Sequence, residues 1–184
     1  VVTERVKALV ELFSKIDSTK ATTNLWGERW TKLAQNSMRN GVSAATGLTG
    51  TDCDSNTALR RFAIQLGGEA VKVGRALGYE VENMGKLNPD RLVAAADGSA
   101  DALAEIEELM MSRTKGNPRA SIQRPSMAQD MHKGRRTEIQ FMNGFIAEKG
   151  KALGIPTPAH EKLTRVVTQV ERGELPASPA NLGG

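Results

Sequence analysis

The sequence predicts an all-α fold in a single domain. Apolar residues recur at spacings of three and four along most of the chain, which is the pattern of helices that bury one face. No run of alternating β-branched residues is long enough to build a sheet. The length of 184 residues suits one domain and is short for two.

Three helices are expected in the first part of the chain. The first is predicted by apolar residues that share one face, which we expect to be buried: Val6, Leu9, Val10, Phe13 and Ile16. The Thr-rich stretch STKATTN ends this helix. A second helix is expected from Leu25 to about Ala44, and a third, longer helix from Leu59 to Leu77.

Two shorter helices are expected next. One opens at NPDRLVAAA, where Pro89 suits a first turn, and the other covers ADALAEIEELMM. The stretch SRTKGNPRASIQRP is typical of an exposed basic loop. After this loop, Ser126 is expected to cap a helix, with Gln129 as its capping-box partner.

Two further helices are expected near the C-terminus. After an interruption at Gly134, one runs from about Thr137 to Leu153, and GIPTP ends it. The last helix carries apolar residues on one side: Leu163, Val166, Val167 and Val170. The segment ELPASPANLGG shows no periodicity. We therefore predict a helical domain over residues 1–175 and a flexible tail over residues 176–184.

Composition argues against several classes of protein. Basic residues number 25 and acidic residues 21, and the resulting net charge of +4 is too small by itself to indicate a nucleic-acid partner. The single cysteine, Cys53, rules out an internal disulfide framework and fits a cytoplasmic protein, which we expect. No apolar run approaches the length of a membrane-spanning helix, so no membrane contact is expected.

Two common kinds of site have no signature in the sequence. Cys53, His132 and His160 lack the paired spacing of metal ligands, so no metal is expected. No two glycines are separated by one residue, so the dinucleotide fingerprint GxGxxG is missing. The chain therefore shows no cradle for the pyrophosphate of a cofactor.

A first candidate cluster lies on the second expected helix. Lys32, Asn36 and Asn40 stand four residues apart in WTKLAQNSMRN, which places them on one stripe at the border of the buried face. A lysine there could donate a proton, and the two carboxamides could hydrogen-bond a polar ligand. The spacing alone favours a solvated helix edge.

A second candidate cluster lies in RPSMAQDMHKGRRTEIQFMNGF. It holds Ser126, Asp130 and Glu138, and the last falls in the first turn of an expected helix, where the dipole stabilises a carboxylate. Arg135 and Arg136 beside that helix start could bind an anion, although charged pairs are common on surfaces. Taken singly, each of these residues is more often structural than catalytic.

Together, the two segments resemble the two signature blocks of the C-terminal domain of ketopantoate reductases (2-dehydropantoate 2-reductases). The first block matches at Trp30, Lys32, Leu33, Asn36 and Asn40. The second block matches at many fixed spacings: Ser126, Met127, Gln129, Asp130, Gly134, Arg135, Thr137, Glu138, Ile139, Asn143, Gly144, Thr157 and Pro158. The resemblance runs from about Glu4 to Leu175, and His160 stands where the family usually has Asn.

The resemblance implies roles for five residues. Lys32 would be the catalytic general acid, protonating the ketone oxygen as hydride arrives from NADPH. Glu138 would lie near that lysine as the second catalytic residue and bind the substrate or the nicotinamide side. Asn36 would hydrogen-bond the substrate, Ser126 would bind its carboxylate end, and Asn40 matches as a further substrate-binding position.

The resemblance also implies a missing partner. The family joins an N-terminal Rossmann domain to this helical domain, with the active site between them. We therefore expect the chain to be the C-terminal half of a reductase, inactive alone, whose NADPH is held mainly by the N-terminal domain. The reaction would convert ketopantoate to pantoate in pantothenate and coenzyme A biosynthesis. A homodimer is expected as well.

Three alternatives remain open at this stage. The same fold could serve a reductase for another 2-keto acid. A helical interaction module without catalysis is the second alternative, and the intact set of candidate residues argues against it. The third is a nucleic-acid-binding domain, although the sequence has no recognisable binding motif. Its phosphate contacts would come from basic residues: Lys115, Arg119, Arg124, Lys133, Arg135 and Arg136.

Overall fold

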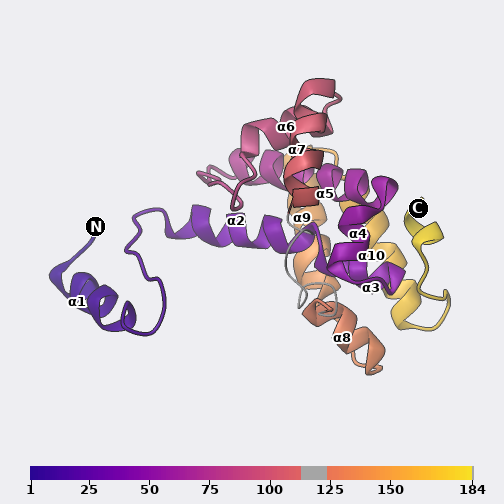
Figure 1. Ribbon diagram of the computed structural model, residues 1–184, viewed down its shortest axis with the longest axis horizontal. Helices are drawn as coiled ribbons and strands as arrows, with labels where there is room; N and C mark the ends of the chain where they lie inside the picture. The colour runs from indigo at the N-terminus through magenta and orange to yellow at the C-terminus, as the bar shows by residue number, and fades with distance from the viewer. Residues whose placement is uncertain (113–123, 184) are drawn as a thin grey trace.

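The computed structural model describes residues 1–112 and 124–183 (Figure 1). The helices within these ranges are α1 Glu4–Phe13, α2 Leu25–Ser37, α3 Asn40–Thr46, α4 Gly50–Ser55, α5 Thr57–Ala76, α6 Pro89–Ala96, α7 Ala100–Ser112, α8 Ser126–His132, α9 Ile139–Leu153, α10 Pro158–Glu171 and the 3-10 helix η1 Pro179–Leu182. The only β pairing in the described ranges is an isolated bridge between Met84 and Leu87. The predicted all-α fold is confirmed.

Helix α5 is the central element of the body. It packs against α2, α4, α6, α7, α9 and α10, and Figure 1 shows it surrounded by these helices. Its inward positions, among them Leu59, Ile64 and Leu66, have no exposed surface. The Asn56 side chain caps its first turn by accepting a hydrogen bond from the Leu59 backbone N–H. Among the described helices, none is both long and apolar enough to cross a membrane.

A glycine sets how closely α2 approaches α5. A Cβ at Gly74 would lie 2.2 Å from Nε1 of Trp30, so only glycine leaves room for the indole ring. The Trp30 Nε1–H donates to the carbonyl oxygen of Ala70 at 2.9 Å, and its ring contacts those of Tyr79 and Phe145. Trp30 therefore fixes the position of α2, which carries Lys32.

The helix expected from Leu25 to about Ala44 is two helices, not one. Arg39 lies between α2 and α3 with φ −124° and ψ −45°, outside regular helical geometry. The change of direction brings Gly41 against α10, where a Cβ would lie 2.9 Å from Leu163. Helix α3 then packs on both α8 and α10. Periodicity did not reveal this break because both helices have apolar residues at similar spacing.

Helix α1 forms as predicted, but its apolar face is not covered. No residue of α1 is buried, and Leu9, Leu12 and Phe13 are about half exposed. Figure 1 shows α1 apart from the other helices, at the end of a long connecting segment. The predicted buried face is therefore wrong for the described chain, because an amphipathic pattern does not reveal whether a partner is present.

The C-terminal segment contacts α3. The Ser178 N–H and the Asn181 side-chain amide both donate to the carbonyl oxygen of Ala45, at 3.1 and 3.2 Å. Leu182, in η1, is buried in the core. These contacts favour a docked segment over the flexible tail that we expected for residues 176–184.

One local feature also differs from expectation, and one expected feature lies mostly outside the described residues. Helix α4 was not predicted, although Thr49 and Asp52 form a capping box at its start. The expected basic loop lies mostly at residues 113–123, outside the described residues, as do Lys115 and Arg119.

Candidate active site

Lys32 lines a shallow pocket beside α2. The pocket has a volume of about 210 Å³, and its lining residues are Lys20, Glu28, Thr31, Lys32, Gln35, Glu82 and Asn83. Lys20 forms ion pairs with both acidic residues, at 2.9 Å to Glu28 and 3.5 Å to Glu82. The Lys32 ammonium is exposed and has no hydrogen bond or ion pair with any described residue. It is therefore free to meet a ligand.

The wall of this pocket is held by hydrogen bonds between α2 and the segment after α5. The Thr31 hydroxyl donates to the carbonyl oxygen of Gly27 and accepts from the backbone N–H of Glu82 at 2.9 Å. The Asn24 side-chain amide donates to the carbonyl oxygen of Glu80 and to the Glu82 carboxylate. The Lys20 contacts lower the pKa of the Glu28 carboxyl and raise that of the Lys20 ammonium. Both acids of the pocket are thus compensated by Lys20 and not by Lys32.

Asn36 and Asn40 follow Lys32 along the chain but do not share its pocket. Asn36 lies one turn further on α2 and is half-buried. Asn40 is the first residue of α3, beyond the break at Arg39, and is also half-buried. The single helical stripe that we predicted for these three residues is therefore interrupted between Asn36 and Asn40.

Ser126 and Glu138 line a second pocket, between α8 and the start of α9. Its volume is about 500 Å³, and its lining residues are Ser126, Asp130, Arg136, Thr137, Glu138 and Phe141. Glu138 occupies the N-cap position of α9, makes no side-chain capping bond and is exposed. The turn that presents it is anchored by Thr137, whose N–H and hydroxyl both donate to the Glu171 carboxylate, at 3.1 and 2.7 Å.

Ser126 is not the helix cap that we predicted. Pro125 occupies the N-cap position of α8, and Ser126 is its first residue. Gln129 does not return to Ser126, because its side-chain amide donates to the carbonyl oxygen of Arg124 at 2.8 Å. The Ser126 side chain is exposed and forms no hydrogen bond with a described residue, so its hydroxyl is available to a ligand.

Lys32 and Glu138 line separate pockets on neighbouring helices. Helices α2 and α9 are in contact, through the Asn143 side-chain amide bonded to the Ser37 carbonyl oxygen at 3.0 Å and through the rings of Trp30 and Phe145. The structure thus groups Ser126 with Glu138, and Lys32 with the acidic pair of the first pocket. A single cleft that joins all the predicted site residues stays a proposal.

A buried polar network lies beneath α2 and α9. His160 has no exposed surface, and its Nε2–H donates to the carbonyl oxygen of Leu66, while Nδ1 accepts from the Asn143 amide at 3.1 Å. Burial lowers the pKa of His160 to about 4. Burial likewise raises the pKa of Glu69, whose carboxylate accepts two backbone N–H bonds at the start of α10. These groups hold α2, α5, α9 and α10 together and do not line either pocket.

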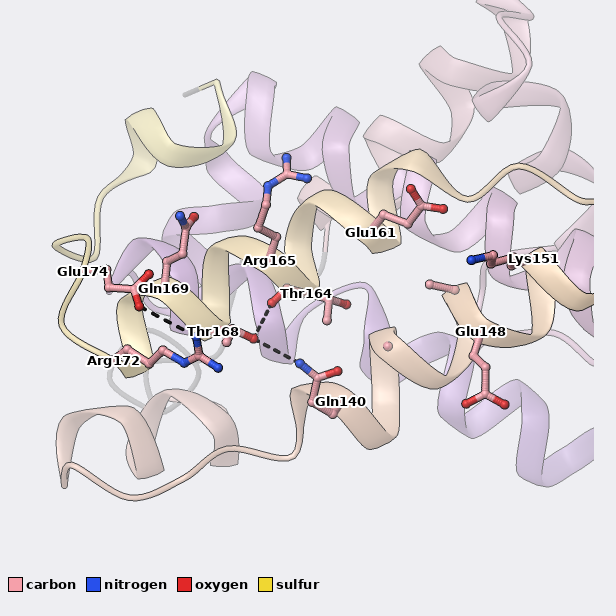
Figure 2. Close-up of a pocket in the computed structure, with 12 residues that line it drawn as sticks. Gln140, Glu148, Lys151, Glu161, Thr164, Arg165, Thr168, Gln169, Arg172 and Glu174 are labelled. Atoms are coloured by element: carbon pink, nitrogen blue, oxygen red, sulfur yellow. Dashed lines mark hydrogen bonds and ion pairs between the residues drawn. The ribbon is translucent and has the colours of Figure 1, made fainter.

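A third hollow lies between α9 and α10 (Figure 2). Its volume is about 1030 Å³, and its edges carry basic and acidic side chains in equal number: Lys151, Arg165, Arg172, Glu148, Glu161 and Glu174. Across it, the Gln140 amide donates to the Thr168 hydroxyl at 3.2 Å. No predicted site residue lies here, and no single charge dominates it.

The sequence did not single out Phe141, which lines the second pocket. Its ring is 79% exposed, although the buried face of α9 runs through Ile139, Met142 and Ile146. The sequence did contain a sign of this exposure, because Phe141 does not fall on the helical period that joins the buried positions of α9.

The arrangement of the helices defines the class of protein. The chain shares its fold with a PanE/ApbA family ketopantoate reductase from Ralstonia eutropha JMP134, with a TM-score of 0.67 and 26% identity over 94% of this chain and 50% of that chain. It also resembles D-mandelate dehydrogenase in complex with NADH and anilino(oxo)acetate, with a TM-score of 0.70 over 94% of this chain and 63% of that chain. At 22% identity, the second likeness concerns the fold alone. The fold is that of the helical domain found in such oxidoreductases.

Residues 24–171 match the family described as Ketopantoate reductase PanE/ApbA C terminal, and the chain belongs to this family. The 2-dehydropantoate 2-reductase of Archaeoglobus fulgidus is 26% identical over 144 residues, which cover 78% of this chain and 40% of that protein. The predicted family is thus confirmed. The chain spans less than half the length of this curated relative.

Proposed function

We propose that the chain is the substrate-binding and proton-donating half of an NADPH-dependent 2-dehydropantoate 2-reductase, which converts ketopantoate to pantoate. The observation that carries the proposal is the free ammonium of Lys32, on a helix within the family match. A general acid must reach its substrate and must not be occupied by another protein group. Lys32 is exposed in its pocket and has no ion pair with a described residue, which supports this role, whereas Lys20 in the same pocket is ion-paired.

Reduction of a ketone needs a proton donor at the oxygen. As hydride reaches the carbonyl carbon, negative charge builds on the oxygen, and a positioned ammonium stabilises and then neutralises it. Such proton transfer contributes on the order of 10²–10⁴-fold to the rate. Lys32 would supply this proton, and Glu138 would act beside it on the substrate or nicotinamide side.

Substrate recognition would use neutral polar groups. Ser126, Asn36 and Asn40 would hydrogen-bond the carboxylate and the other oxygens of the keto acid. A site built to bond such groups rejects analogues that lack them, because a buried partner is then left unpaired. The proposal requires the pockets of Lys32 and of Ser126 to open onto one cleft in the full-length protein.

The nicotinamide cofactor would be held mainly by a preceding domain. Pyrophosphate is usually bound by a glycine-rich turn that follows a strand and begins a helix, and the sequence has no pair of glycines with the required spacing. NADPH would supply the hydride, while the residues of this chain bind the keto acid and donate the proton.

The test is steady-state kinetics of the full-length protein on ketopantoate and on a panel of other 2-keto acids. We expect ketopantoate to be the preferred substrate and Lys32→Ala to lower kcat by about 10²–10⁴-fold without unfolding the protein. Lys86→Ala, at an exposed lysine that does not line this pocket, is the control and should retain most of the activity. Near-normal turnover of Lys32→Ala would remove Lys32 from the catalytic role.

A further inference from the structure

Two residues of the pocket between α8 and α9 have no role in the proposed reaction so far. Ser126 and Glu138 are accounted for, Thr137 is engaged with Glu171, and Asp130 has Arg135 as its ion-pair partner at 3.9 Å. Arg136 and Phe141 remain. One is a cation and the other an exposed aromatic ring, and both face the same hollow as Ser126 and Glu138.

The two neighbouring arginines differ in their partners. Arg135 lies 3.9 Å from the carboxylate of Asp130, and it does not line the pocket. Arg136 lines the pocket and has no hydrogen bond or ion pair with any described residue. Since Arg135 offsets the charge of Asp130, the guanidinium of Arg136 is the cation left to receive a ligand in this pocket.

A guanidinium and a hydroxyl that line one pocket, each without a partner among the described residues, suit a carboxylate. The guanidinium has five N–H donors in a planar fork and can form two parallel bonds to the two oxygens of a carboxylate. The hydroxyl of Ser126 can donate one more hydrogen bond to the same group. Glu138, which lines the same pocket, would repel an anion that is not held by such donors.

The exposed ring of Phe141 adds a preference for the rest of the ligand. It is 79% exposed, so it is available as an apolar wall of the pocket. A branched or aromatic side chain on the ligand would cover this ring and remove apolar surface from water. A methyl group, as in pyruvate, would cover little of it.

We propose that Arg136 binds the carboxylate of the substrate together with Ser126, and that Phe141 selects 2-keto acids with a bulky apolar side chain. The inference rests on the proposed reductase function for its reaction, but not for the binding itself. Arg136 is a specificity-determining residue that acts on the ground state and the transition state alike, because the carboxylate does not change during the reduction.

The test compares Arg136→Gln with Arg135→Gln in the full-length protein. Arg136→Gln should raise KM for ketopantoate by about 10- to 100-fold with little change in kcat, the loss expected for a charge-assisted hydrogen bond. Arg136→Gln should leave kcat/KM unchanged for the neutral amide of ketopantoate, which has no carboxylate to bind. Arg136→Lys keeps the positive charge and should restore part of the affinity that Arg136→Gln loses. Arg135→Gln removes the neighbouring charge and the ion-pair partner of Asp130 but no group that lines the pocket, so it should raise KM far less than Arg136→Gln does.

Binding of pantoate, measured by titration calorimetry, separates this inference from the proposed reaction. A wild-type protein that reduces no 2-keto acid but binds pantoate through Arg136 would contradict the reaction only. Equal pantoate affinity in the wild type and Arg136→Gln, or an equal loss in Arg135→Gln, would overturn the role of Arg136.

The preference for bulky side chains is tested with Phe141→Ala. Its ring is largely exposed, so the substitution should leave the protein folded. We expect kcat/KM for 2-ketoisovalerate to fall about 10-fold relative to that for pyruvate. An unchanged ratio between these two substrates would overturn the selection by Phe141.

Discussion

Lys20 and Lys32 share one pocket, but Lys20 alone of the two is ion-paired with a described residue, and Arg135 and Arg136 differ in the same way. In each pair, one cation forms an ion pair with a neighbouring carboxylate, and the other has no ion pair with a described residue. The sequence predicts the residue types and their spacing, but not these pairings. They depend on the segment after α5 in the first pocket and on the fold of α8 in the second.

His160 makes the stability of the fold sensitive to acid. Its pKa falls from 6.5 to about 4 in the fold, because burial disfavours the charged ring. The unfolded chain therefore takes up a proton first as the pH falls below 6.5. Folding stability should decrease between pH 6.5 and about 4, by about 3 kcal/mol from this residue.

The measurement is urea unfolding of the wild type and His160→Gln from pH 7 to pH 4. Glutamine keeps a donor near the position of Nε2, which bonds the Leu66 carbonyl oxygen, and it cannot titrate. As the pH falls from 6.5 to 4, the wild type should lose more stability than His160→Gln does. Subtracting the curves removes the opposing contribution of Glu69, whose raised pKa favours its protonated form in the fold. Parallel curves would show that His160 does not titrate as proposed.

Helix α1 illustrates what periodicity can and cannot predict. Its apolar stripe was visible in the sequence, and the helix forms, but none of its residues is buried. The family match begins at residue 24, after α1. The central α5 was predicted correctly because its apolar face is long and continuous. The six residues of α4 hold too few apolar positions to show a period.

Removal of residues 1–17, which include α1 but not Lys20, should leave the helical body intact. Because α1 buries nothing in the described chain, we expect the Tm of the truncated chain to stay within about 2 °C of that of the full 184 residues. Leu66→Ala is the control, since Leu66 on α5 is fully buried and its truncation should cost about 2–5 kcal/mol. A large drop in Tm on truncation would mean that α1 packs on the body in solution. Thermal unfolding, monitored by circular dichroism, measures the Tm of the truncated chain and of the Leu66→Ala control.

Leu182→Ala tests the docked C-terminal segment. Leu182 is buried, so its truncation should lower the free energy of unfolding by about 2 kcal/mol, whereas a flexible tail predicts no change. The urea midpoint measures the difference. Leu25→Ala at the exposed start of α2 is a matched control, because that side chain is 54% exposed and should contribute little.

At the scale of the whole molecule, the fold and family were predictable and the layout of the site was not. The family resemblance assigned Lys32 and Glu138 to one site, and this assignment stays a prediction, because the two side chains line different pockets of the described chain. Which residues share a pocket depends on long-range packing, such as the fit of Trp30 against Gly74, which no local pattern reveals. The structure agrees with the sequence on most helices, apart from the break at Arg39 and the unpredicted α4, and adds which polar groups lack a partner among the described residues.

The chain alone should bind NADPH weakly or not at all, and should not reduce ketopantoate. It spans less than half the length of its curated relative, and its sequence lacks the glycine turn that normally holds a pyrophosphate. Lys32 can donate a proton, but a hydride must come from a bound nicotinamide, so the isolated chain lacks the source of electrons. Calorimetric titration of residues 1–184 with NADPH is the direct measurement, and the full-length protein, which should bind the cofactor and turn over, is the control. Micromolar binding by the isolated chain would show that these helices contribute a cofactor site of their own.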